Sequence, residues 1–153
     1  MTIAPPPLPA TLQLDAARQF DFLLGEWDCT WSDGESGTDS VYLDLDDKVV
    51  VQSFDGRPSL DYQGMSHSVY DRAAGRWKQT WVDTDGNYLD FVGGFAEGEM
   101  ELRREAPFDG GTALFRLRWF DIERDALSRA YERSDDGGES WTTLWAIDYR
   151  RVL

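Results

Sequence analysis

Cysteine and histidine are almost missing from this sequence, which contains one of each, Cys29 and His67. A single cysteine excludes an internal disulfide framework and any zinc site built on several cysteines. A single histidine excludes catalytic metal centres that use two or three histidines. We therefore expect the protein to hold no metal and no cofactor, with a haem bound by His67 as a minor alternative.

Basic residues and long apolar runs are also scarce. Lysine and arginine number 15 against 29 aspartates and glutamates, which gives a net charge of -14. Such a charge repels phosphate backbones and anionic lipid surfaces, so we expect neither a nucleic acid nor a membrane as a partner. No apolar run approaches the ~20 residues that a membrane-spanning helix needs.

Aromatic residues, by contrast, are abundant, with 7 Trp, 6 Tyr and 8 Phe in 153 residues. The apolar runs are short and alternate with clusters rich in Asp and Gly, a composition typical of all-β proteins. We expect a flexible Pro-rich arm over residues 1–11 and a single domain over residues 12–153. Residues 12–24 have the only helix-like spacing and predict one short helix that ends near Gly25.

From Gly25 onward the pattern predicts about ten strands joined by hairpin turns. Connections such as TDGN at 84–87 and FDGG at 108–111 contain the residues that short hairpins require. Ten antiparallel strands in sequence order close best as an up-and-down barrel, because closure removes exposed edges; a sandwich is the alternative. The predicted strands are 25–32, 38–46, 48–54, 66–71, 76–83, 88–95, 100–106, 113–122, 127–134 and 141–151.

Tryptophan recurs four residues apart on three of these strands. Because residues i and i+4 of a strand point to the same face, each strand turns two indoles to one side. The indoles either fill the core or line a cavity in which a few polar groups orient a ligand. Both arrangements fit one barrel, one at each end. The pairs are Trp27 and Trp31, Trp77 and Trp81, and Trp141 and Trp145.

Three stretches carry a family resemblance. FDFLLGEWDCTW at 20–31 resembles the start of lipocalin-like (calycin) barrels, where a short helical turn precedes a Gly-x-Trp motif, here Gly25 to Trp27. Residues 76–94 and 131–151 are similar to a bacterial lipocalin-like family of unknown function. The resemblance implies a barrel with an internal pocket and a late basic residue, Arg150 or Arg151, over Trp27. Cys29 has no partner for the disulfide of secreted lipocalins, which fits a cytoplasmic location.

The first functional hypothesis is binding of a small apolar or amphipathic molecule inside the barrel. Arg129 and Tyr131 share one strand face, and a guanidinium fork matches a ligand carboxylate. The alternative for Arg129 is an outward position in a surface ladder near Glu132. The predicted pocket walls are Trp81, Trp119, Tyr131 and Trp145, and the predicted polar anchors are Gln79, Arg129 and His67.

The second hypothesis is an enzyme of isomerase, cyclase or hydrolase type that uses His67 or Asp83 as a general acid or base. His67 shares a strand face with Val69, and Asp83 extends an aromatic face to the end of its strand. The third hypothesis is a pocketless interaction domain whose barrel is filled by tryptophan. A homodimer is compatible with the sequence, although nothing in it requires one.

Two acidic motifs predict turns, with a weak surface calcium site at the second as the alternative. SDDGGESW at 134–141 resembles an Asp-box, in which a carboxylate accepts backbone hydrogen bonds and glycines allow a positive φ. DTDGN at 83–87 begins like a calcium loop, but it lacks the glycine and glutamate that such a loop needs at its sixth and twelfth positions. Cys29, between two tryptophans, is expected to be buried and unreactive.

Overall fold

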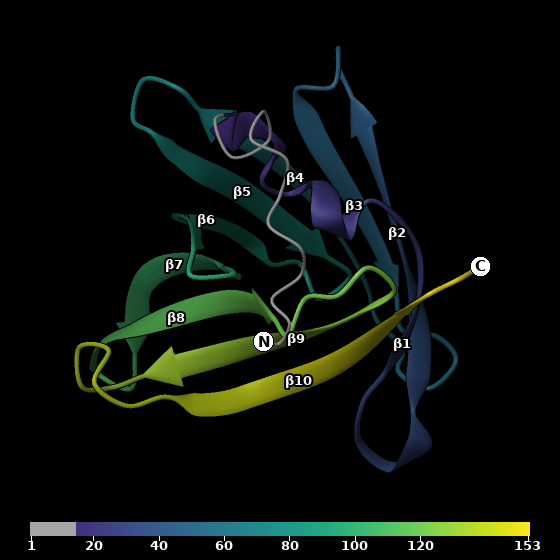
Figure 1. Cartoon of the computed structure of the whole chain (residues 1–153). Helices are drawn as coiled ribbons and strands as arrows, with labels where there is room; N and C mark the ends of the chain where they lie inside the picture. The colour runs from purple at the N-terminus through teal and green to yellow at the C-terminus, as the bar shows by residue number, and fades with distance from the viewer. Residues whose placement is uncertain (1–14) are drawn as a thin grey trace.

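Residues 15–153 are described by the structure, a computed structural model, and they contain ten antiparallel strands in one closed barrel. Each strand pairs with its neighbours in sequence, and β1 also pairs with β10, so the ten strands complete a ring (Figure 1). The predicted ten-stranded up-and-down barrel is confirmed, and the sandwich alternative is wrong. The strands are β1 (Gly25–Thr30), β2 (Ser36–Asp44), β3 (Val49–Asp55), β4 (Gln63–Asp71), β5 (Arg76–Asp83), β6 (Tyr88–Ala96), β7 (Glu99–Phe108), β8 (Gly111–Phe120), β9 (Ala126–Ser134) and β10 (Thr142–Arg151).

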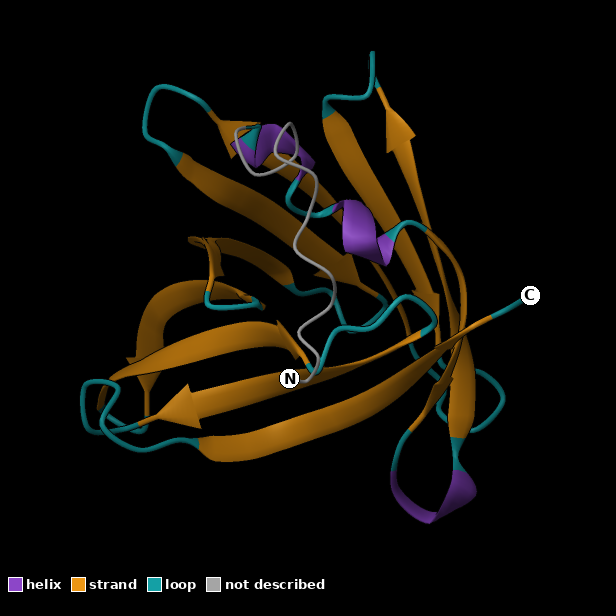
Figure 2. Cartoon of the chain, in the orientation of Figure 1, coloured by secondary structure: helices purple, strands orange, loops and turns teal. Residues whose placement is uncertain are grey.

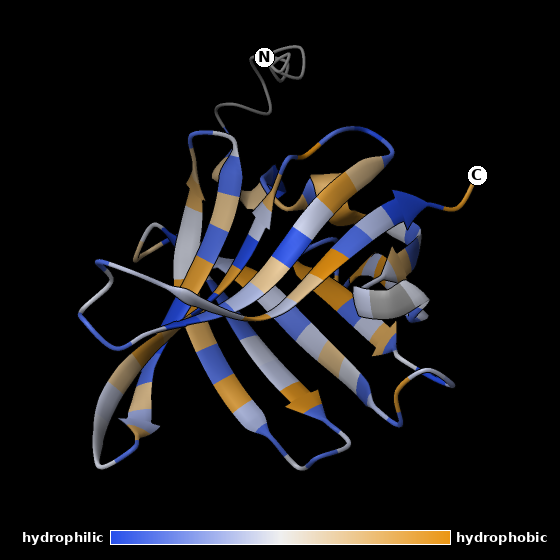
Figure 3. Cartoon of the chain, turned by 90° about the horizontal axis from the view of Figure 1, so that it is seen from below, coloured by the Kyte–Doolittle hydropathy of each residue, from blue (hydrophilic) through white to orange (hydrophobic). Residues whose placement is uncertain are grey.

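The core forms because buried and exposed side chains alternate along the strands. In β5, Trp77, Gln79 and Trp81 point inward and are buried, whereas Arg76 and Lys78 are exposed. Figure 3 shows hydrophobic and hydrophilic residues alternating along several strands. Because successive residues of a strand point to opposite faces, this pattern gives a largely apolar interior and a charged exterior.

The predicted short helical segment before β1 is confirmed and consists of two 3-10 turns, η1 (Ala16–Arg18) and η2 (Asp21–Leu23). The Asp15 carboxylate begins η1 by accepting a hydrogen bond of 3.1 Å from the Ala17 amide. Figure 2 shows the two turns one after the other before the chain enters β1, and η1 contacts β4. Within residues 15–153, no helix has the length and apolar character needed to cross a membrane. The predicted arm, residues 1–11, lies outside the described residues.

Aromatic side chains fill the end of the barrel that the helical turns cover. The ring of Phe20 lies edge-to-face between Trp77 and Trp119, with centroid distances of 5.1 and 5.0 Å. The indole nitrogen of Trp27 donates a hydrogen bond of 2.8 Å to the carbonyl of Leu23. The side chains of these four aromatic residues and of Leu23 are almost completely buried. This end of the barrel is a packed core in which tryptophan acts as filler.

Arg151 is the late basic residue that packs over Trp27, with its guanidinium carbon 4.2 Å from the ring centroid. Its Nε donates to the Arg124 carbonyl at 3.0 Å, and its Nη1 donates to the Leu24 carbonyl. Arg150 is exposed. Of the two residues that the resemblance left open, Arg151 is therefore the one over Trp27. Its hydrogen bonds connect the last strand to the chain that enters the first.

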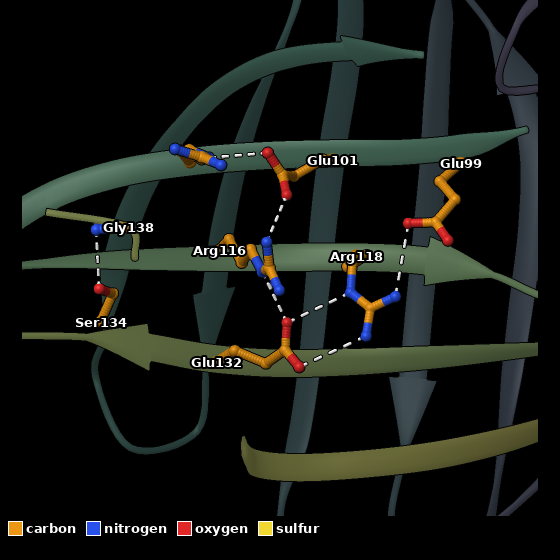
Figure 4. A network of polar contacts seen from close by, with 8 residues as sticks. Glu99, Glu101, Arg116, Arg118, Glu132, Ser134 and Gly138 are labelled. Carbon is orange, nitrogen blue, oxygen red and sulfur yellow. Dashed lines mark hydrogen bonds and ion pairs between the residues drawn. The ribbon is translucent and has the colours of Figure 1, made fainter. Parts of the chain in front are cut away.

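A ladder of arginines and glutamates covers the outer face of β7, β8 and β9 (Figure 4). Glu132 is only 5% exposed, and its carboxylate pairs with Arg116 at 2.6 Å and with Arg118 at 3.3 Å. Arg116 also pairs with Glu101, and Arg118 with Glu99. The charges of this ladder therefore compensate one another across three strands.

Trp141 lies next to this ladder, with the guanidinium carbon of Arg116 3.9 Å from its ring centroid. Trp145, in contrast, lies inside the barrel. The pairing of β9 with β10 shifts register between Thr143 and Trp145, and such a bulge changes the face that the following side chains occupy. The prediction that Trp141 and Trp145 share one face is therefore wrong.

Candidate functional site

A cavity of about 280 Å³ occupies the other end of the barrel. Trp77, near the start of β5, packs on Phe20, whereas Trp81, four residues later, lines the cavity. The tryptophan spacing therefore serves core filling at one end and a cavity wall at the other, as the sequence allowed. The apolar lining consists of Trp81, Leu89, Phe91, Leu117, Tyr131, Trp145 and Ile147, and the polar lining consists of Tyr62, Asp83, Asp85, Asn87, Arg104 and Arg129.

Four predicted ligand-binding residues line this cavity together: Trp81, Arg129, Tyr131 and Trp145. They come from the consecutive strands β9 and β10 and from β5, which lies more than 40 residues earlier in the sequence. Arg129 is only 6% exposed and points inward, so its alternative placement in a surface ladder is wrong. The ladder exists, but its arginines are Arg116 and Arg118.

Gln79 and Trp119 point inward as predicted but lie outside the cavity lining. Gln79 donates a hydrogen bond of 2.9 Å to Ser68 Oγ in the neighbouring strand. Trp119 is fully buried, and the guanidinium carbon of Arg129 lies 5.5 Å from its ring centroid. These two residues therefore do not line the cavity, and Trp119 belongs to the packed end, where it contacts Phe20.

His67 lies on the outside of the barrel, which corrects the prediction that it faces the interior. It is exposed, like Met65 and Val69 on the same face of β4. The inward residues of this strand are the buried Ser66 and Ser68. Ser66 Oγ donates to Gln52 Oε1 at 3.0 Å, and Ser68 Oγ accepts from a neighbouring glutamine. Polar side chains take the inward positions because inward partners satisfy their hydrogen bonds.

Asp83 lies at the cavity mouth as predicted, but its carboxylate already has several hydrogen-bond partners. Oδ2 accepts from the Tyr62 hydroxyl at 2.8 Å and from the Trp81 indole at 3.0 Å. The Asn87 amide side chain and two turn amides donate to the same carboxylate. Partial burial opposes ionisation, but the hydrogen bonds from Asn87, Tyr62 and Trp81 outweigh it and lower the pKa of Asp83. Asp83 therefore fixes the mouth in place and is a poor proton acceptor.

Arg129 is a buried cation with few partners. Within residues 15–153 it forms no ion pair, and its one hydrogen bond runs from Nη1 to the Tyr149 hydroxyl at 3.3 Å. Its guanidinium carbon lies 5.2 Å from the ring centroid of Trp81. An arginine side chain carries five N–H donors and stays protonated, so most of the donor capacity of Arg129 is unused.

Asp39 lies behind Arg129 and was not among the predicted site residues. It is 1% exposed, and its Oδ2 accepts hydrogen bonds from the Tyr149 hydroxyl and from Gln52 Nε2, both at 2.6 Å. Burial raises the pKa of Asp39 to about 6, although Arg129, Tyr149 and Gln52 act in the opposite direction. Its Oδ1 has no partner among the described residues. The alternation that places Val41 inward also places Asp39 inward, so the sequence contained the signal.

Other lining residues also escaped prediction. Arg104 follows the inward alternation of Met100 and Leu102 in β7, and this pattern indicates its position. Phe91 is buried in β6, two residues after the inward Leu89. Tyr62 belongs to the connection between β3 and β4, where no periodicity indicates a direction.

The remaining motifs are structural. Cys29 is buried, and desolvation raises the pKa of its thiol far above the ordinary value. In the Asp-box turn, Asp136 accepts hydrogen bonds from the Ser140 amide and the Ser134 hydroxyl. Among residues 15–153, no three His, Cys, Asp or Glu side chains are grouped to hold a metal ion.

Comparisons of the whole chain with protein-family models and with curated proteins find no match. The geometry of the cavity is therefore the basis for a functional proposal.

Proposed function

We propose that the protein binds a small amphipathic molecule in the cavity of its barrel. The observation that carries this proposal is Arg129, a buried cation that lines an aromatic cavity without an ion-pair partner among the described residues. Burial of an unpaired charge is costly, so a residue of this kind is typical of a site that receives a ligand. Small-molecule sites combine apolar walls with a few polar anchors in the same way.

The alternative functions have less support from the geometry. His67 is exposed on the outer face, away from the cavity. Asp83 is the other acid–base candidate, and its oxygens are occupied by donors from Tyr62, Trp81 and Asn87. The pocketless interaction domain requires a barrel filled throughout, whereas aromatic packing fills one end here.

Native mass spectrometry tests the proposal. Protein purified from a bacterial host without refolding would be measured alone and after incubation with single-ring and short-chain acids, amides and amines. We expect a one-to-one adduct that disappears on denaturation. Ile147→Phe, which places a ring in the cavity, is expected to remove the adduct. A bare chain with every compound, or an adduct that survives in a folded Ile147→Phe variant, would contradict binding in the cavity.

A further inference from the structure

Three charged side chains are buried among the described residues: Asp39, Arg129 and Glu132. Glu132 belongs to the outer ladder, where two arginines compensate it. Asp39 and Arg129 are inside the barrel, and the Tyr149 hydroxyl lies between them as a neutral link. Arg129 is the one of the three that lines the cavity. Of the two buried charges inside the barrel, the cation therefore faces the cavity and the carboxylate lies behind it.

The unused donors of Arg129 define the group that suits this position. A guanidinium offers parallel N–H donors in a planar fork, and a carboxylate accepts two of them at once. A second arginine, Arg104, also lines the cavity, and so do Asp83 and Asp85; the Asp83 carboxylate already accepts hydrogen bonds at the mouth. A cationic group next to Arg129 would be repelled, and a neutral group there would leave the charge of Arg129 uncompensated.

The size and lining of the cavity limit the rest of the ligand. Its volume of about 280 Å³ lies just below the roughly 300–1,000 Å³ typical of small-molecule sites. At roughly 30 Å³ for each water-sized group, it holds about ten such groups. Trp81, Phe91 and Trp145 line it, and aromatic rings pack well against one another in edge-to-face or offset contacts. These dimensions favour one ring with a short side chain over a long alkyl chain.

We infer that the ligand is a small aromatic monocarboxylate whose carboxylate pairs with Arg129 and whose ring lies between Trp81, Phe91 and Trp145. This inference rests on the proposed function and specifies the chemical class of its ligand. The pair would bury the ligand charge against a cation that has no other ion-pair partner in residues 15–153.

Isothermal titration calorimetry with matched probes tests the inference. Phenylacetate supplies the ring and the carboxylate, phenylacetamide has the same shape without the charge, and phenethylamine reverses the charge. We expect phenylacetate to bind roughly tenfold to hundredfold more tightly than phenylacetamide, the range expected for hydrogen bonds to a charged group. Phenethylamine is expected to bind more weakly than either, and decanoate no more tightly than phenylacetate.

Three variants locate the preference for the acid. Arg129→Met is expected to abolish it, and Arg129→Lys to retain only part of it, because lysine keeps the charge but loses the fork. Arg118→Met removes an arginine from the outer ladder and is expected to leave the preference intact. Near-UV circular dichroism checks each fold. If Arg129→Met does not fold, the double variant Arg129→Met/Asp39→Asn removes both interior charges together and takes its place.

The outcomes separate the inference from the proposed function. Equal affinity for the acid and the amide, or a preference for the acid that survives in folded Arg129→Met, would overturn the inference while small-molecule binding stands. Tighter binding of decanoate than of phenylacetate would overturn the size class. No binding by any probe would contradict the proposed function as well. A preference for the acid that is lost in Arg129→Met and kept in Arg118→Met supports the inference.

Discussion

The Tyr149 hydroxyl donates a hydrogen bond of 2.6 Å to the carboxylate of Asp39, joining the last strand to the second inside the barrel. The same hydroxyl accepts a hydrogen bond from Arg129 at 3.3 Å. A cation and a carboxylate are thus coupled through a neutral group, without direct contact. This arrangement keeps the guanidinium available to the cavity while the carboxylate behind it lessens the cost of burying it.

The burial of Asp39 predicts an unusual dependence of stability on pH. The pKa of Asp39 is about 6 in the folded protein, above its ordinary value of 3.8. Between these values the folded state holds a proton that the unfolded chain has lost, so the contribution of Asp39 to the free energy of unfolding falls as the pH rises. Relative to Asp39→Asn, wild type is expected to lose on the order of 2 kcal/mol between pH 4 and pH 7.

Urea denaturation of both proteins across this pH range gives the measurement. Subtracting the two curves removes the contribution of carboxylates with lowered pKa values, such as Asp83 and Glu132, which titrate in both proteins. A difference in unfolding free energy that stays constant from pH 4 to pH 7 would contradict the claim that Asp39 is buried and takes up a proton in this range.

Anion binding should respond to the same carboxylate. A carboxylate ligand on Arg129 brings a second negative charge near Asp39 and favours its protonation. The affinity for phenylacetate is therefore expected to rise severalfold as the pH falls from 8 to about 5, and Asp39→Asn is expected to abolish this dependence. Calorimetry in buffers of different ionisation enthalpy would detect the accompanying uptake of a proton.

The groups around Asp39 allow the pH dependence of binding to be assigned to this residue. Arg129 stays charged over this range, and the raised pKa values of Tyr149 and Cys29 keep both groups neutral. Glu26 is exposed, and Gln52 does not titrate. An unchanged pH dependence in Asp39→Asn would assign the effect to another group and contradict the coupling.

Much of the fold follows from patterns in the sequence, because strand alternation and turn residues are local signals. Inward and outward faces were harder to assign where polar residues occupy the interior. In β4, Ser66 and Ser68 face inward and bond to glutamines, while His67 faces solvent. The bulge before Trp145 depends on the pairing with β9, which local sequence does not specify. The mixture of aromatic and arginine side chains in the candidate site was predictable. The hydrogen-bond and ion-pair partners of each charged side chain were not, because they depend on how the barrel closes.

Arg151→Met is expected to destabilise the barrel by about 1–3 kcal/mol, because it removes the contact with Trp27 and the hydrogen bond to the Arg124 carbonyl. Arg150→Met is the matched control. The Arg150 side chain is exposed and has no hydrogen bond or ion pair among the described residues, so its substitution is expected to change stability by less than about 0.5 kcal/mol. Equal effects in urea denaturation would refute the role of Arg151.

Asp83→Ala is expected to lower the free energy of unfolding by about 1–2 kcal/mol and to weaken ligand binding, because the Tyr62 and Trp81 side chains lose their shared acceptor. Asp28→Ala is the control, since the exposed Asp28 side chain lies outside the cavity lining and accepts no hydrogen bond within residues 15–153. Thermal denaturation and calorimetry measure both effects. Unchanged stability and affinity in Asp83→Ala would mean that the carboxylate does not hold the mouth in shape.

The most direct test of the account is a nitrogen-15 NMR titration that follows the indole signals of the seven tryptophans while phenylacetate is added. Single Trp→Phe variants assign the signals. Trp81 and Trp145 line the cavity, so their signals are expected to shift most. Trp27 and Trp77 belong to the packed end and are expected to move little. Saturable shifts confined to Trp81 and Trp145 would support binding in the cavity; shifts largest at Trp141, on the outer face, or no shifts at all, would contradict it.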